Sequence, residues 1–185
     1  MKKKVIYSII IVSVIIILSV AVTYAVYTFS GSVNISGTSE CFDVNYVKGQ
    51  DIGSDSNPAN FVLASTYTEG VSSVIKVNLK DTCTITNGTG TLYLNTDTSV
   101  TSSTLLSGKL LKYQVLDGTT SVGSGVVSSA ESIEIYKDIP ITTTVKTITV
   151  YIWLDGNLVT EQNQNEILSS VYKGHISMDI KSGDK

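Results

Sequence analysis

The residues best suited to covalent chemistry are Cys41 and Cys83, the only two cysteines of the chain. Each stands beside a segment in which apolar and polar residues alternate, a pattern typical of strands. A bond between them would close a loop of about 43 residues and remove unfolded-chain entropy equivalent to roughly 4 kcal/mol. The alternative is two free thiols, which would be exposed to oxidation outside the cytoplasm. We therefore predict a disulfide between Cys41 and Cys83.

The sequence contains few residues suited to acid-base catalysis or metal binding. His175 is the only histidine, and its position predicts that it lies on the polar side of the last strand. The chain has no His-Glu-x-x-His zinc motif, no Gly-x-Ser-x-Gly nucleophile elbow and no glycine-rich phosphate loop. Its acidic residues are scattered singly. We predict that the protein is not an enzyme and has no catalytic residues, no metal site and no cofactor.

A calcium site in the polar loop at 48–60 is the one metal alternative. Asp51, Asp55 and Asn57 could supply oxygen ligands there. The loop lacks the twelve-residue spacing and the closing glutamate of a calcium-binding loop, which favours an ordinary polar turn.

Residues 5–22 form an apolar run without a charged residue, preceded by lysines at positions 2–4. About 18 or more such residues can cross the roughly 30 Å hydrocarbon core of a bilayer as a helix. Basic residues beside a first span remain in the cytoplasm, so we expect everything after Phe29 to lie outside the membrane. If this segment is not cleaved, residues 5–29 bind the membrane as an anchor.

The end of the apolar run has two interpretations. Thr23 and Ala25 occupy the positions of small residues at a signal-peptide cleavage site, which predicts a cut between Ala25 and Val26. The run is longer than the usual signal core, however, and the aromatic residues after it could form the interfacial belt of a retained anchor. We expect an extracytoplasmic protein, either secreted or anchored, organised as follows: 1–25, signal peptide or anchor; 26–36, first strand and candidate donor strand; 37–185, β-sandwich domain.

The charge of the chain limits its partners. It has 13 basic residues against 16 acidic ones, a net charge of −3, and removal of the three leader lysines would make it about −6. An acidic, hydroxyl-rich surface argues against nucleic acid as a partner. All basic residues are lysines, which argues against bidentate recognition of phosphate or carboxylate. The sequence identifies no small-molecule substrate.

The pattern after residue 26 has period two almost everywhere and is rich in Val, Ile, Thr and Tyr, as strands require. Residues 145–154 are apolar on both faces and predict a central strand, while the glycine-rich residues 122–127 predict an edge strand or an irregular segment. Residues 87–90 carry a strong turn signal. These features indicate an all-β protein, a jelly-roll or immunoglobulin-like β-sandwich of about 8–10 strands preceded by one hydrophobic helix.

Several short motifs resemble those of a known family of exported proteins. In order they are the lysine-led apolar segment that ends Thr23-Tyr24-Ala25, then Cys41-Phe42-Asp43-Val44, Asp81-Thr82-Cys83, Tyr151-Ile152-Trp153-Leu154-Asp155 and Gly174-x-Ile176. The chain is similar to low-GC Gram-positive proteins with a SipW-type signal peptide, the TasA and camelysin relatives. The resemblance implies a jelly-roll-like sandwich at the cell surface and, for TasA, a fibre-forming subunit of the biofilm matrix.

The segment at 26–36 is the candidate assembly strand. Its odd positions Tyr27, Phe29, Val33 and Ile35 form an apolar row broken only by Gly31. Such a strand can pair within its own sheet or add to the edge of a neighbouring molecule. The resemblance favours the second use, by donor-strand exchange, and repetition of that contact head to tail would give filaments.

Three functions remain as hypotheses. The first is a non-enzymatic surface or matrix protein that associates with itself or with related surface proteins. The second is a membrane-anchored adhesin or carbohydrate-binding sandwich that uses Tyr151 and Trp153, although core packing is the favoured interpretation of Trp153. The third is a camelysin-like metalloprotease, which the resemblance implies and which the absence of a ligand cluster in the sequence disfavours.

Overall fold

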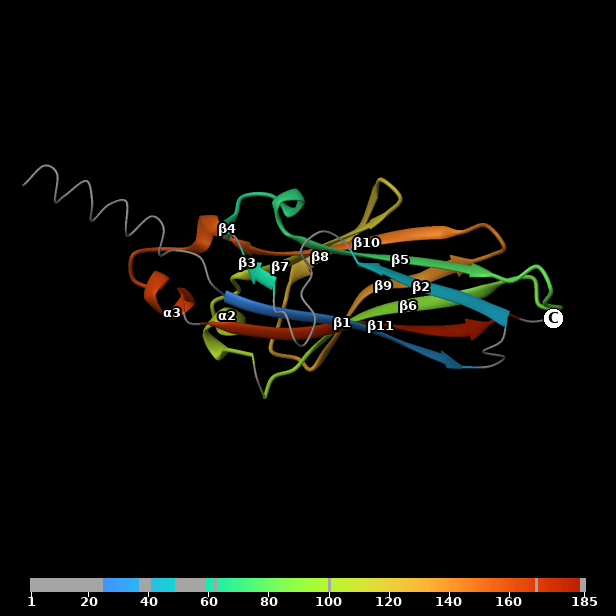
Figure 1. Ribbon diagram of the computed structural model, residues 1–185, viewed down its shortest axis with the longest axis horizontal. Coiled ribbons are helices and arrows are strands. Elements are labelled where there is room, and N and C mark those ends of the chain that lie inside the picture. The colour runs from blue at the N-terminus through green and yellow to red at the C-terminus, as the bar shows by residue number, and fades with distance from the viewer. Residues whose placement is uncertain are drawn as a thin grey trace, which may run out of the picture.

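The computed structural model describes residues 25–36, 41–48, 59–61, 63–99, 101–168 and 170–183. Within them the fold is mostly β, with two sheets packed face to face as a sandwich (Figure 1). The sandwich prediction is therefore confirmed. No helix in these segments is long and apolar enough to span a membrane. The predicted N-terminal helix and the calcium alternative at Asp51, Asp55 and Asn57 lie outside the described residues.

The first sheet contains the N-terminal and C-terminal strands side by side. Its order is β3 (Ala59–Phe61), β1 (Ala25–Ser36), β11 (Val171–Ser182), β6 (Gly88–Thr96) and β9 (Ser132–Ile141). All neighbours are antiparallel except β1 and β11, which run parallel.

The second sheet has its strands in the order β2 (Phe42–Lys48), β5 (Val71–Leu79), β10 (Lys146–Asp155), β7 (Leu111–Asp117) and β8 (Thr120–Val126). The two-residue β4 (Leu63–Ala64) extends it by pairing with the end of β10. The predicted central strand is β10 and the predicted edge is β8, so both predictions are confirmed.

Within the described segments, four short helices connect the strands. They are η2 (Tyr67–Glu69), α2 (Ser103–Ser107), η3 (Gly156–Leu158) and α3 (Gln164–Leu168). The helices α2 and α3 lie together at one end of the sandwich, on the left in Figure 1. The described residues contain eleven strands rather than the predicted 8–10. The surplus includes β3 and β4, which are too short for a period-two pattern to reveal.

The core consists of the inward residues of both sheets. In β5, Ile75, Val77 and Leu79 are at most 2% exposed, as their alternation with polar neighbours predicts. In β11 the corresponding residues are Met178 and Ile180, which are fully buried. Burying one such side chain contributes about 1.5–3 kcal/mol, so these alternating rows hold the two sheets together.

The predicted turn at residues 87–90 is wrong, because β6 already begins at Gly88. A Cβ atom at Gly88 would lie 2.6 Å from the ring of Phe42, and one at Gly90 would lie 2.7 Å from the terminal methyl of Met178. These glycines therefore leave room for core side chains from other strands. The glycine pattern predicts a turn because a tight turn and a closely packed strand position both favour a residue without a side chain.

A disulfide joins Cys41 to Cys83, with their Cα atoms 5.6 Å apart, and confirms the prediction. It ties the start of β2 to the segment that follows β5. The main chain reinforces this junction, since the amide of Lys80 donates to the carbonyl of Cys41 at 2.9 Å.

Replacement of Cys41 and Cys83 by serine should lower the free energy of unfolding by about 4 kcal/mol, because the bond closes a loop with a sequence separation of 42. Thermal unfolding of the oxidised protein and the double variant measures the loss. Reductant should lower the melting temperature of the parent protein only. Equal melting temperatures for the two oxidised proteins would contradict this prediction.

Candidate functional site

The pairing of β1 with β11 determines where the candidate assembly strand lies in the fold. The ladder runs without a break from Val26 opposite Val171 to Ser36 opposite Lys181. On its other edge, among the described residues, β1 pairs with β3 alone, through residues 25–27. Most of the pairing that holds β1 in the described structure therefore comes from the single edge of β11. Of the two uses predicted for this strand, the structure adopts pairing within its own sheet.

The register pairs each residue of the predicted apolar row with a buried residue of β11. Tyr27, Phe29, Val33 and Ile35 stand opposite four buried residues, in order Tyr172, Gly174, Met178 and Ile180. Directly paired residues share one face of a sheet. The odd positions of β1 thus occupy core-facing register positions, while its even positions stand opposite the more polar residues of β11.

Gly174 occupies a position of β11 where there is no space for a side chain. A Cβ atom there would lie 2.5 Å from the hydroxyl of Tyr172 and 2.8 Å from the carbonyl oxygen of Asn95. Tyr172 is itself fully buried, its hydroxyl lies 3.2 Å from Oγ1 of Thr96, and burial raises its pKa to about 12. In the register of the ladder, this position stands opposite Phe29.

An open hollow of about 720 Å³ lies beside the start of β11. Residues from three regions line it: the end of β6 with the following loop, the start of β9, and the start of β11. It contains charges of both signs, Asp97 and Glu131 against Lys173. The solitary His175 also lines this hollow and is half-buried rather than fully exposed.

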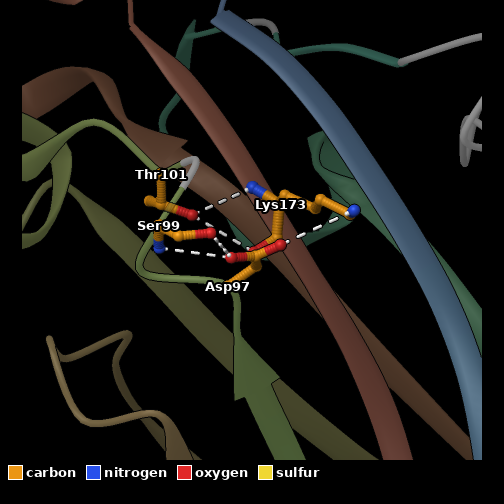
Figure 2. A network of polar contacts seen from close by, with 4 residues as sticks. All are labelled: Asp97, Ser99, Thr101 and Lys173. Atoms are coloured by element: carbon orange, nitrogen blue, oxygen red, sulfur yellow. Dashed lines mark hydrogen bonds and ion pairs between the residues drawn. The ribbon is translucent and has the colours of Figure 1, made fainter.

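The polar contacts in the hollow hold the start of β11 to the loop after β6 (Figure 2). The amide of Asp97 donates to the carbonyl of Lys173 at 2.8 Å, which continues the ladder between β6 and β11 by one bond. The hydroxyl of Thr101 then takes the place of a second main-chain partner. It accepts from the Lys173 amide at 3.1 Å and donates to the Lys173 carbonyl at 3.2 Å.

The carboxylate of Asp97 completes this network. It accepts from the hydroxyl of Ser99 at 2.5 Å and from the amide of Ser99 at 3.2 Å, and it lies 3.6 Å from Nζ of Lys173. The Ser99 hydroxyl bond, followed by the Ser99 amide and Lys173, lowers the pKa of Asp97 below its ordinary value. Asp97 is therefore ionised at neutral pH, and its carboxylate connects Ser99 to Lys173. We assign it no role as a general base.

A second cluster, the aromatic cluster of Tyr67, Tyr151 and Trp153, lies on the outer face of the second sheet. The ring of Tyr67 meets Tyr151 edge-on at 5.1 Å and lies 6.4 Å from Trp153, measured between ring centroids. All three side chains are half-buried and none belongs to the buried core. The favoured interpretation of Trp153 as a core residue is therefore wrong, because it packs against η2 on the sheet exterior.

Metal chemistry gains no support from the described segments, in which no three His, Cys, Asp or Glu residues lie close enough to hold an ion. Comparison with protein-family models gives no match to the chain, and no curated protein matches it. The proposals below therefore depend on the geometry of this molecule and on the resemblance noted from its motifs.

Sequence reasoning missed the Asp97, Thr101 and Lys173 network. The motif Asp97-Thr98-Ser99 is a signal for a side-chain-capped turn, because an aspartate often accepts the amide two residues later. Nothing local in the sequence indicates that Lys173, which follows more than 70 residues later, is the partner strand.

Replacement of Thr101 by valine should lower the free energy of unfolding by about 1–3 kcal/mol, because Thr101 is 7% exposed and the Lys173 amide loses its buried acceptor. Thr101→Ser keeps the hydroxyl and serves as the matched control. Urea unfolding of the three proteins gives the difference, and hydrogen exchange should be accelerated at the start of β11. Equal stability of the valine and serine variants would contradict the role assigned to this hydroxyl.

Proposed function

We propose that the protein is a non-enzymatic cell-surface or extracellular matrix protein whose copies associate by exchanging β1. The observation that carries the proposal is the ladder between β1 and β11. An N-terminal strand held largely by one edge can be replaced by the same strand of another copy, since the new contacts are identical to the old ones. Main-chain bonds then supply affinity, and alternate side chains supply specificity.

The predicted cleavage site supports this use of β1. The ladder with β11 begins at Val26, the residue that follows the predicted cut. Cleavage between Ala25 and Val26 would release the molecule from its leader and leave all residue pairs of the ladder available. An uncleaved chain would keep β1 tethered at the membrane surface, which restricts exchange.

The disulfide supports an extracytoplasmic location, because such bonds persist in oxidising compartments. The proposed family is that of the TasA and camelysin relatives, with a jelly-roll type of sandwich and a fibre-forming role in a biofilm matrix. Its support is the resemblance in motifs together with the coarser sandwich architecture. The camelysin-like protease is the least supported function, since the described residues contain no cluster of His, Cys, Asp or Glu that could hold a metal ion.

A chain that begins at Val26 should form oligomers whose fraction rises with concentration, whereas a chain that begins at Gly37 should remain monomeric with its sandwich largely folded. Light scattering and circular dichroism measure the two properties. A synthetic peptide of residues 26–36 should bind the shorter chain, because the edge of β11 is then unpaired.

Two peptide variants test whether the register seen here governs that binding. Phe29→Asp places a charge at a core-facing register position and should abolish binding, while Thr28→Asp, opposite Lys173, should preserve it. Monomers from both chains at high concentration would exclude strand exchange. Collapse of the shorter chain would show that β1 is a permanent part of its own core.

A carbohydrate-binding function is the second candidate, and the aromatic cluster favours it. Half-buried aromatic rings on a sheet exterior offer apolar faces for sugar rings, and Lys112 and Gln114 occupy the register positions opposite Trp153 and Tyr151. The plane of the Tyr67 ring is inclined at 67° to that of Tyr151 and at 57° to that of Trp153, so the three rings do not form a flat platform.

Under this second function, Trp153→Ala should abolish binding on a glycan array. Tyr93→Ala, a half-buried tyrosine of β6 in the other sheet, should leave binding unchanged and serves as the matched control. Thermal unfolding of both variants checks that they are folded. Absence of any bound glycan for the parent protein, or unchanged binding by Trp153→Ala, would remove this candidate.

A further inference from the structure

The end of β1 and the start of β2 lie at the same end of the sandwich. Ser36 is paired with Lys181 at the end of β11. A Cβ atom at Gly88 would contact both the ring of Phe42 at 2.6 Å and the carbonyl oxygen of Lys181 at 3.1 Å, so these two residues are close neighbours. We call this region, with Cys41, Cys83, Gly88 and Lys181, the disulfide end. Figure 1 shows it on the right, opposite the end that carries α2 and α3.

The chain between β1 and the body of the molecule is short. Five Cα to Cα steps separate Ser36 from Cys41, which span at most about 19 Å. Cys41 is fixed to its own sandwich by the disulfide and by the bond from the Lys80 amide. The sandwich is much longer than this connection, because the 12 residues of β11 extend over about 36–40 Å.

From these lengths we infer that copies that exchange β1 meet disulfide end to disulfide end. A donated β1 in the observed register has its Ser36 beside Lys181 of the acceptor. The donor's Cys41 must then lie within about 19 Å of that point. The donor's disulfide end is therefore next to the acceptor's disulfide end, and the acceptor's α2 and α3 end is out of reach.

This geometry changes the expected form of the assembly. A strict head-to-tail order, with the disulfide end of one copy against the α2 and α3 end of the next, cannot be spanned by this connection. Reciprocal exchange closes into a two-fold symmetric dimer. One-way exchange gives a chain of molecules whose disulfide ends follow the axis and whose sandwiches project sideways. The disulfide end exposes Lys80 and Lys181 together with Asp81, so two such ends carry charges of both signs.

The inference rests on the proposed strand exchange, and cross-linking of native lysines tests it. The chain that begins at Val26 contains every described helix and strand apart from the first residue of β1. Unlabelled and isotope-labelled protein are mixed in denaturant, refolded together and treated with a short lysine-reactive cross-linker. Peptides that combine both isotopes then identify contacts between copies in the isolated oligomer.

The expected result is that mixed-isotope cross-links join Lys80 and Lys181 of different copies. Lys109, exposed beside α2 at the other end, should be absent from them. The double substitution Lys80→Arg and Lys181→Arg should remove these cross-links and leave the oligomer intact, while Lys109→Arg should change nothing. Oligomers whose cross-links join Lys80 or Lys181 to Lys109 would overturn the inference alone. Absence of oligomers would overturn it together with the proposed function.

Discussion

The structure depends above all on the double pairing of β11. This strand presents a fully buried row to the core, and it hydrogen-bonds to β6 on one edge and to β1 on the other. Pairing on both edges stabilises such a strand, because a main-chain amide or carbonyl left unpaired and shielded from water costs about 1–3 kcal/mol. The strand β1 satisfies the second edge, since residues 26–36 pair with β11 along its length.

Two devices hold the framework around that ladder. At one end, Asp97 and Thr101 bond to the main chain of Lys173 and fix the start of β11 where β6 stops. At the other end, the disulfide fixes the start of β2 to the segment after β5. Together they hold the acceptor edge and the chain connection in place independently of β1. The proposed strand exchange would leave both of these connections unchanged, because neither involves β1.

The same contacts give residues at the polar hollow a structural role. The Asp97 carboxylate is engaged by Ser99, and its pKa is lowered as a consequence. Thr101 is occupied by the main chain of Lys173. The hydrogen bonds of Asp97 and Thr101 therefore serve to position the start of β11.

Local patterns in the sequence were sufficient for the strands with long alternation, such as β5, β10 and β11, because a period of two directly reports which face is buried. They were also sufficient for the disulfide, since two cysteines beside strands allow one pairing. Gly88 and Gly90 were misread because the reason for a missing side chain lies in Phe42 and Met178, which come from other strands.

The sequence by itself therefore determined the alternating strands, the sandwich class, the disulfide and the apolar row of β1. Only the tertiary structure decided that β1 runs parallel to β11, that Thr101 bonds to Lys173 and that Tyr67 packs on Tyr151. The physical reason is that alternation specifies which face of a strand is buried, whereas the neighbour of that strand is chosen by packing among residues far apart in the chain.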